Sequence, residues 1–270
     1  MTKMRLDMLV LEKGFAESRE KARAMIMAGL IFCGNQRMDK AGTMVDPTIT
    51  LEVRGETCPY VSRGGLKLQK ALEFFQVDVN GKICMDLGAS TGGFTDCLLQ
   101  QGAKLVYAID VGYGQLDFKL RQDERVIVRE RENVRYITAE QFPKTPSFAV
   151  MDLSFISLKL VLPAACLVLE EGGALICLVK PQFEAGKGEV PKSGVVKDIS
   201  VHEKVLKDFI LTAEEIGFAV MGVTYSPICG AKGNIEYLAY LKKDVVLDTQ
   251  IDIEKIVAES HANLLQGDKM

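Results

Sequence analysis

Tryptophan is absent from this chain of 270 residues, and histidine occurs only at His202 and His261. So few histidines argue against a histidine-based metal site, and we expect no metal. The seven cysteines form no Cys-x-x-Cys pair and mostly lie in apolar runs, which favours reduced core residues over disulfides or a zinc site. No apolar run approaches the roughly 20 residues of a membrane span. The N-terminus has an early acid and no apolar signal-peptide segment, so we expect a cytoplasmic protein.

The net charge of −3 hides an asymmetry along the chain. Residues 1–70 contain 12 Lys and Arg and 8 Asp and Glu, a balance of +4, whereas the other 200 residues contain 21 and 28, a balance of −7. A basic head on an acidic body favours an anionic partner for the head, and ordinary scatter of surface charge is the alternative.

The first 58 residues predict a small α+β unit. Apolar positions from Leu6 to Val10 predict a helix closed by Gly14, and Ser18 is placed to cap a second helix that runs to about residue 29. A strand from Leu30, a turn at 34–35 and further short strands follow. Residues 5–7, 18–22, 26, 29–31 and 40 resemble the S4-type RNA-binding domain. We expect phosphate contacts from Arg5, Arg19, Lys21, Arg23, Arg37 and Lys40.

Residues 83–96 predict a strand, a small-residue loop and the start of a helix, the unit that opens nucleotide-type sites in α/β folds. Asp86 stands at the strand tip, where a carboxylate would repel a pyrophosphate and attract a cation. S-adenosylmethionine is an adenosyl ligand with that charge, and a generic glycine-rich turn is the alternative. We predict S-adenosylmethionine as the cofactor, held by Asp86 and by Gly88, Ala89, Ser90, Gly92, Gly93 and Phe94.

Beyond this unit, apolar strands alternate with helical segments, which predicts an α/β fold with a mostly parallel sheet and helices on both faces. We expect strands at 83–86, 105–110, 126–128, 148–152, 174–179, 218–223 and 236–241, and helices from 66, over 158–169 and over 201–216. The predicted division is an RNA-binding domain at 3–58, a linker at 59–65, the α/β domain at 66–245 and a tail at 246–270.

Charged residues end three of the predicted strands. Asp110 is placed to bind ribose hydroxyls, and a loop or helix-capping acid is the alternative. Asp152 and Lys180 end two further strands, and a lysine at the end of a buried strand needs a partner. We expect the two to pair, with Asp152 also binding the cofactor, either as part of a catalytic site or as a structural ion pair.

Four motifs, at 62–68, 152–158, 180–184 and 233–236, resemble the TlyA (hemolysin A) family of FtsJ-like ribosomal RNA methyltransferases, which carry an S4-type domain. The resemblance spans nearly the whole chain and implies a Rossmann-like class I methyltransferase domain. It implies a catalytic tetrad of Lys67, Asp152, Lys180 and Glu236, and methylation of a cytidine ribose 2′-hydroxyl in ribosomal RNA. In that chemistry Lys180 takes or stabilises the proton of the 2′-hydroxyl, Asp152 orients Lys180, and Glu236 positions Lys67 or the hydroxyl.

The segment at 184–198 is long, contains glycine and follows Lys180 directly. We predict a flap in which Lys187 and Lys192 meet phosphates, as Arg63 does from the linker, and a solvated surface loop is the alternative. Two other functions stay open: a non-catalytic RNA-binding or ribosome-assembly protein, and a membrane-active hemolysin. The intact cofactor acids and tetrad argue against the first, and the lack of an export signal or amphipathic segment argues against the second.

Overall fold

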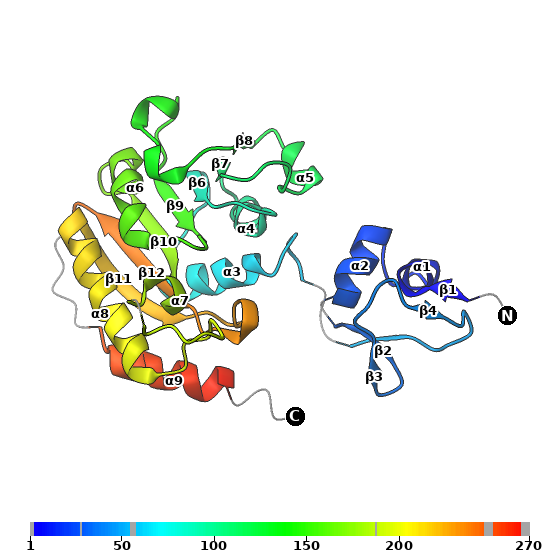
Figure 1. Cartoon of the computed structure of the whole chain (residues 1–270). Coiled ribbons are helices and arrows are strands. Elements are labelled where there is room, and N and C mark those ends of the chain that lie inside the picture. Colours follow the sequence, from blue (N-terminus) through cyan, green and yellow to red (C-terminus); the bar gives the residue numbers. More distant parts are fainter. Residues whose placement is uncertain (1–2, 28, 55–57, 187, 246–250, 266–270) are drawn as a thin grey trace. The chain divides into compact units, whose positions relative to one another are not determined.

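The computed structural model describes residues 3–27, 29–54, 58–186, 188–245 and 251–265. The chain divides into two compact units, Met1–Pro59 and Tyr60–Met270 (Figure 1). Each unit has its own hydrophobic core, one built around Leu6, Ile26 and Ile31 and the other around the central sheet.

The first unit contains two helices and short strands. These are β1 (Met4–Arg5), α1 (Leu6–Glu12), α2 (Arg19–Met27), β2 (Ile31–Cys33), β3 (Gln36–Arg37), β4 (Met44–Val45) and β5 (Glu52–Val53). The predicted helix cap is present, because the Ser18 hydroxyl accepts a hydrogen bond from the Lys21 amide at 3.2 Å. The predicted hairpin joins β2 to β3. The small α+β unit is therefore confirmed.

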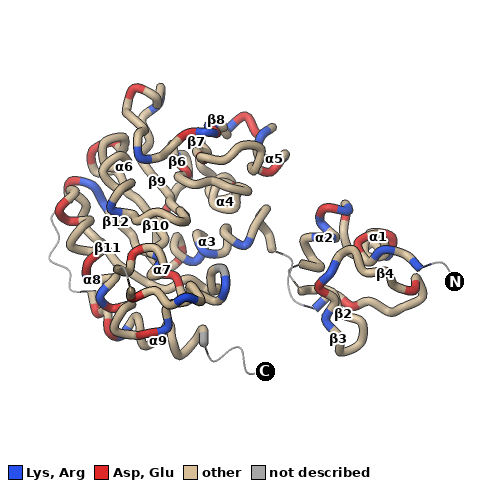
Figure 2. The backbone as a smooth tube through the Cα atoms, in the orientation of Figure 1, with Lys and Arg blue, Asp and Glu red and all other residues tan. Residues whose placement is uncertain are grey.

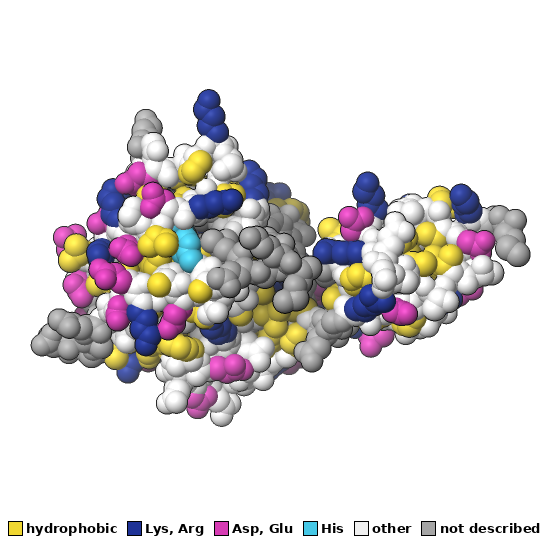
Figure 3. Space-filling model, turned by 90° about the horizontal axis from the view of Figure 1, so that it is seen from below, with side chains coloured by type: hydrophobic (Ala, Val, Ile, Leu, Met, Phe, Trp, Pro, Cys, Tyr) yellow, Lys and Arg dark blue, Asp and Glu magenta, His cyan; other side chains and the backbone are white. Residues whose placement is uncertain are grey.

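Apolar positions of α1 and α2 face each other in this first core, since Leu6, Leu9 and Val10 recur at helical spacing, as do Ala22 and Ile26. The charged positions of both helices lie outside it, apart from Asp7. Figure 2 marks basic positions on α2 and beside β1, with acidic positions among them. On the face in Figure 3, several basic side chains project from this unit among scattered acidic ones.

The second unit is built on a seven-stranded sheet with the order β11-β12-β10-β9-β6-β7-β8. Its strands are β6 (Ile83–Leu87), β7 (Leu105–Asp110), β8 (Val126–Glu130), β9 (Phe148–Met151), β10 (Ala174–Val179), β11 (Phe218–Tyr225) and β12 (Tyr237–Lys243). β12 runs antiparallel to both of its neighbours, and the strands from β10 to β8 are parallel. The mostly parallel sheet is confirmed, and the carboxyl ends of β6, β9 and β10 meet at one edge.

Helices cover both faces of this sheet (Figure 1). On one face α3 (Gly64–Phe75) and α4 (Gly93–Gln100) pack together, and Phe75 of α3 stacks on Tyr240 of β12. On the other face α6 (Leu162–Val168), α8 (Ile199–Ile216) and α9 (Ile253–Leu265) join the core of the sheet. Short helical turns complete the unit: α5 (Phe118–Arg121), α7 (Pro181–Glu184), η1 (Val134–Tyr136), η2 (Ala139–Gln141), η3 (Leu158–Leu160) and η4 (Ala231–Gly233). The predicted helices and strands are all present.

Parts of the predicted linker (59–65) and of the predicted tail (246–270) pack within the second unit. In the predicted linker, Tyr60 is buried and the Val61 amide donates to the Asp96 carboxylate of α4 at 2.8 Å. In the predicted tail, Val257 of α9 is fully buried against the sheet core. Residues 246–250 and 266–270 of that tail lie outside the described part of the chain.

Cys33, Cys84, Cys97, Cys166 and Cys177 are free thiols. Over the described ranges, no helix is both long and apolar enough to cross a membrane. Nor do His, Cys, Asp and Glu residues form a group of three or more that could hold a metal ion in that part of the chain.

Candidate active site

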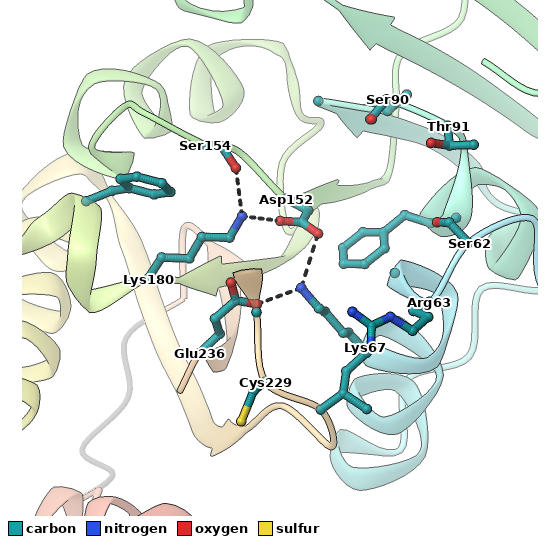
Figure 4. A pocket seen from close by; sticks show the side chains of 18 of the residues that line it. Ser62, Arg63, Lys67, Ser90, Thr91, Asp152, Ser154, Lys180, Cys229 and Glu236 are labelled. Atoms are coloured by element: carbon teal, nitrogen blue, oxygen red, sulfur yellow. Dashed lines mark hydrogen bonds and ion pairs between the residues drawn. The ribbon is translucent and has the colours of Figure 1, made fainter. Parts of the chain in front are cut away.

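A cavity of about 500 Å³ opens where β6, β9 and β10 end, beside the first turn of α3 (Figure 4). Its volume lies in the usual range of small-molecule sites. Its lining includes most of the predicted cofactor residues and the whole predicted tetrad. The lining residues are Ser62, Arg63, Gly64, Lys67, Gly88, Ala89, Ser90, Thr91, Gly93, Phe94, Asp152, Ser154, Phe155, Lys180, Gln182, Phe183, Ile228, Cys229, Gly230 and Glu236.

The loop between β6 and α4 needs glycine because its backbone passes close to other segments. Gly88 has a φ of +92°, and a Cβ there would come within 2.7 Å of the Leu153 side chain and 3.0 Å of the Asp152 carbonyl oxygen. At Gly93 a Cβ would lie 2.9 Å from the Gly65 amide nitrogen. Larger residues at either position would push the loop away from β9 or α3, so the glycines keep the loop at the cavity wall.

Asp86 is fully buried within β6 and lies outside the cavity lining, although Gly88, two residues later, is part of it. Its Oδ2 accepts a hydrogen bond from the Thr95 hydroxyl at 2.7 Å, whereas its Oδ1 has no partner among the described residues. Burial raises the pKa of Asp86 to about 7, and the Thr95 hydrogen bond opposes that rise. Its predicted contact with the cofactor stays a prediction.

Asp110 and Gly92 also lie outside the cavity lining. Both carboxylate oxygens of Asp110 are engaged locally, since one accepts the Ser90 amide at 2.8 Å and the other the Gly112 amide at 2.7 Å. Asp110 therefore fixes the glycine loop from the end of β7. Each oxygen keeps a lone pair, so these bonds are compatible with the predicted ribose contact.

The four predicted catalytic residues form one continuous chain of ion pairs (Figure 4). Lys67 Nζ lies 2.6 Å from Glu236 Oε2 and 3.7 Å from Asp152 Oδ2. Lys180 Nζ lies 2.6 Å from Asp152 Oδ1 and donates to the Ser154 hydroxyl at 3.2 Å. The Lys180 side chain is 7% exposed, that of Glu236 is 3% exposed and that of Asp152 is 22% exposed, so the two cations and two carboxylates neutralise each other at the largely buried wall of the cavity.

The first turn of α3 positions Lys67. The Tyr60 ring occupies the space beside Gly65, where a Cβ would come within 2.2 Å of the ring, and the Tyr60 hydroxyl donates to Gln69 at 3.1 Å. Asp96 of α4 accepts the Val61 amide and thereby ties the start of this segment to the glycine-loop helix. The contacts of Tyr60 and Val61 therefore hold both the start of α3, which carries Lys67, and α4, which follows the glycine loop.

Glu236 precedes β12 and lies against the backbone of Gly230, where a Cβ would come within 2.0 Å of Glu236 Oε1. Only glycine leaves room for that carboxylate in its observed position. Gly230 itself is held by a hydrogen bond from its amide to the Asn234 carbonyl at 2.8 Å. The 226–236 loop therefore sets the position of Glu236.

The segments that follow β9 and β10 are tied together by Glu184 at the end of α7. Its carboxylate accepts the Ser157 hydroxyl at 2.7 Å and the Leu158 amide at 2.8 Å. Burial raises the pKa of Glu184. Because the two strand ends are joined in this way, Asp152 and Lys180 are held at pairing distance, as predicted.

Several residues of the cavity wall are not among those predicted from the sequence. Phe155 is 91% exposed with a φ of +63°, and its ring lies 5.1 Å from that of Phe183. Ser154, Gln182, Cys229 and Gly230 also line the cavity. Ser154, Phe155, Gln182 and Phe183 lie in motifs that resemble the family, so their places beside Asp152 and Lys180 were an available signal.

The predicted RNA-binding residues are spread over both units. Arg5 and Arg19 pair with Asp7, and Lys21 pairs with Glu17. The guanidinium of Arg37 lies over the backbone of Gly29, and Arg23, Lys40, Arg63 and Lys192 are at least partly exposed. Arg63 lines the cavity, whereas Lys187 lies outside the described residues. Their contact with RNA stays a prediction.

The predicted flap is anchored at its second half. Asn234 accepts the Val196 amide at 3.1 Å and donates to the Gly194 carbonyl at 2.9 Å. The Val196 carbonyl lies 3.0 Å from Nε2 of the fully buried His202, whose Nδ1 lies 2.7 Å from the Tyr237 hydroxyl. This network joins residues 194–196 to the segment that carries Glu236.

Comparison with known proteins assigns a family to each part of the chain. Residues 60–243 match the FtsJ-like methyltransferase family, and residues 4–48 match the S4 domain. The chain is 50% identical over 269 residues to YqxC of Bacillus subtilis (strain 168), which is named as an rRNA methyltransferase, and the match covers 97% of this chain and 95% of that protein. It is 43% identical over 239 residues to TlyA of Mycobacterium tuberculosis, named a 16S/23S rRNA (cytidine-2'-O)-methyltransferase, with 88% and 89% covered.

Solved structures agree with these matches. A Streptococcus thermophilus protein that carries the name hemolysin superposes with a TM-score of 0.79 at 46% identity over 100% of both chains. An S-adenosylmethionine dependent methyltransferase from Mesorhizobium loti has a TM-score of 0.50 at 14% identity, over 67% of this chain and 99% of that one, which shows the shared fold alone. The chain therefore belongs to the TlyA family, in which an S4 domain precedes an FtsJ-like methyltransferase domain, and it is an enzyme of that class.

Proposed function

We propose that this protein transfers a methyl group from S-adenosylmethionine to the ribose 2′-hydroxyl of a cytidine in ribosomal RNA. The observation that carries the proposal is the Glu236–Lys67–Asp152–Lys180 chain, which lies in the same cavity as the glycine loop. The named activity of the TlyA relatives supports the nucleotide and the RNA. The family and the fold support methyl transfer.

The residues around the glycine loop fit a cationic cofactor. Gly88 and Gly93 leave a backbone surface without side chains at the cavity wall, and Asp86 Oδ1 is a buried acceptor with no partner among the described residues. A cation bound beside the loop would lower the raised pKa of Asp86, so ligand binding and ionisation of this carboxyl would support each other. When bound, S-adenosylmethionine supplies an electrophilic methyl group.

Lys180 is the residue that we assign to the reacting hydroxyl. Its ammonium can form three hydrogen bonds, and the structure directs two contacts to Asp152 and Ser154. A further donor position is therefore left for a ribose oxygen in the cavity. The hydroxyl loses its proton as its oxygen attacks the methyl carbon. As an ammonium, Lys180 donates to that oxygen and stabilises the negative charge that develops on it; Lys180 receives the proton itself only when it enters the step as a neutral amine.

Lys67 and the two carboxylates position Lys180. Asp152 lies between the two ammonium groups, and Glu236 holds Lys67 at 2.6 Å from its far side. This arrangement fixes the position and orientation of the Lys180 ammonium before substrate binds. Such positioning supplies much of the rate enhancement of methyl transfer. The S4 unit supplies binding of ribosomal RNA and takes no part in the chemistry.

Mapping of ribose methylation tests this function. Ribosomal RNA from cells with and without the protein is compared by primer extension and mass spectrometry, and purified subunits from the deficient cells are then treated with the protein and labelled S-adenosylmethionine. We expect a cytidine 2′-O-methyl group that is lost in the deficient cells and restored in vitro. Labelling of a base, of another nucleotide or of no RNA would contradict the proposal.

A further inference from the structure

Asp7 is an acidic residue buried in the first unit between two arginines that are half exposed. Its side chain is 0% exposed, whereas those of Arg5 and Arg19 are 44% and 45% exposed. Arg5 donates to both carboxylate oxygens, from Nε to Oδ1 at 3.0 Å and from Nη2 to Oδ2 at 3.0 Å. Arg19 Nε donates to the same Oδ2 at 3.1 Å. One buried carboxylate thus holds two guanidinium groups side by side.

The pairing is strong enough to keep Asp7 ionised at neutral pH. The Arg5 hydrogen bonds lower the pKa of Asp7 to about 2, against the effect of burial. The backbone holds the pair in place as well, since the Leu6 amide donates to Thr43 at 2.8 Å and the Asp7 amide to Ala41 at 3.0 Å. Asp7 also lies in the first turn of α1, where a negative charge is favourable.

We propose that Asp7 is a positioning residue for RNA binding, which orients Arg5 and Arg19 as one phosphate-binding fork. The inference rests on the proposed function, because it takes the phosphate groups of ribosomal RNA as the ligand. A guanidinium has five N–H donors. Arg5 directs donors from two of its nitrogens to Asp7 and Arg19 a donor from one, so each keeps donors that face away from the carboxylate.

The local charge and space suit a phosphate. Two arginines and one aspartate leave a net positive charge beside β1. A Cβ at Gly42 would come within 3.3 Å of Arg5 Nη1, so the glycine lets the backbone pack closely against that guanidinium, and the Arg5 side chain is still 44% exposed. The Arg19 side chain is 45% exposed, and the exposed Arg23 follows it one turn later along α2.

The positioning role and a purely electrostatic role predict opposite effects of Asp7→Asn. The substitution removes a negative charge next to two arginines, and by charge alone it strengthens RNA binding. If Asp7 positions the arginines, both long side chains become free to rotate, and binding must order them again. Because each such side chain carries its own ordering cost, we expect affinity to fall on the order of tenfold.

The salt dependence separates loss of positioning from loss of a phosphate contact. In Asp7→Asn both arginines still reach phosphate in the complex, so the slope of log affinity against log salt stays as in the parent. Arg19→Ala, by contrast, removes a contact and should reduce the slope by about one. Glu12→Gln is the charge-matched control, since Glu12 is an exposed acid at the other end of α1, and it should leave affinity unchanged or slightly raised.

The experiment measures binding of the full-length protein to ribosomal subunits from cells that lack it, over a series of salt concentrations. Asp7→Asn is tested in the parent and in an Arg5→Ala/Arg19→Ala background, with a melting curve for each variant. We expect the loss caused by Asp7→Asn to vanish in the double-alanine background, because Asp7 acts through those arginines. Asp7→Glu, which keeps the charge and moves the carboxylate, should also weaken binding.

Two results would overturn the inference: affinity of Asp7→Asn equal to or above that of the parent, or a loss that persists in full without the arginines. If Asp7→Asn unfolds the first unit, Asp7→Glu decides, and parent-like binding by that variant sinks the proposal. Failure of the parent protein to bind ribosomal subunits would instead contradict the proposed function.

Discussion

Replacing Asp86 by asparagine should change stability by an amount that depends on pH. Folding raises the pKa of Asp86 from 3.8 to about 7, mainly through burial. A raised folded pKa means that the folded state binds the proton more tightly, so this stabilising contribution is complete below pH 3.8 and is lost as pH rises through 7. At ~1.4 kcal/mol per unit, the free energy of unfolding falls by about 4 kcal/mol over that range on account of this group.

The amide introduced by Asp86→Asn cannot ionise, so the variant lacks this loss. The difference in unfolding free energy between Asp86→Asn and the parent should therefore move by about 4 kcal/mol in favour of the variant between pH 4 and pH 8. The asparagine amide nitrogen replaces Asp86 Oδ1, which has no partner among the described residues, and this replacement changes stability by the same amount at every pH. That constant term cancels when the difference at pH 4 is compared with the difference at pH 8. Urea unfolding followed by circular dichroism at several pH values, at constant ionic strength, measures it.

Thr95→Val is the companion variant. It removes the hydrogen bond that lowers the pKa of Asp86, so the pH at which the parent loses stability should shift upward. If the difference in unfolding free energy between Asp86→Asn and the parent stays constant within about 1 kcal/mol from pH 4 to pH 8, Asp86 does not have a raised pKa in the folded protein.

Three further outcomes are expected. Gly230→Ala should lower kcat by about a hundredfold at temperatures where the variant is folded, because its Cβ would displace the Glu236 carboxylate; steady-state kinetics below the midpoint of its melting curve checks this. Deletion of residues 1–59 should abolish methylation of ribosomal RNA and keep S-adenosylmethionine binding, which calorimetry measures, since the second unit has its own core. Burial lowers the pKa of His202 below 6.5, so the unfolded chain takes up a proton at this residue before the folded chain does, and the free energy of unfolding falls as the pH drops below 6.5. His202→Gln should remove this fall from the pH dependence measured by urea denaturation.

Much of the fold could be predicted because the strands are continuous apolar runs that end in charged or small residues. Asp152 and Lys180 could be paired from sequence, since both end strands of a parallel sheet and a buried charge needs a partner. The glycine loop could be predicted because small residues stand between an apolar strand, β6, and the start of a helix, α4. Lys67 and Glu236 entered only through the family resemblance, because neither ends a parallel strand.

Contacts between distant segments explain what the sequence could not show. The reversal of β12 brings Glu236 to the cavity, and the pattern of its apolar residues is the same in either direction. The packing of α9 depends on space left by α8 and β11. The burial of Asp7 depends on Arg5 and Arg19 together, and an acid at a helix start usually faces solvent.

Single-turnover methyl transfer by Lys180→Ala, measured beside its melting curve and with Lys104→Ala as control, tests whether Lys180 acts on the reacting hydroxyl. Lys104 is an exposed lysine at the opposite edge of the sheet, before β7. We expect Lys180→Ala to bind cofactor and RNA, to stay folded and to transfer methyl about 10²–10⁴-fold more slowly. A purely structural ion pair instead predicts a loss of about 3–5 kcal/mol in stability, with activity falling only as the protein unfolds. A folded Lys180→Ala protein that methylates RNA at the rate of Lys104→Ala would contradict the assignment of Lys180 to the reacting hydroxyl.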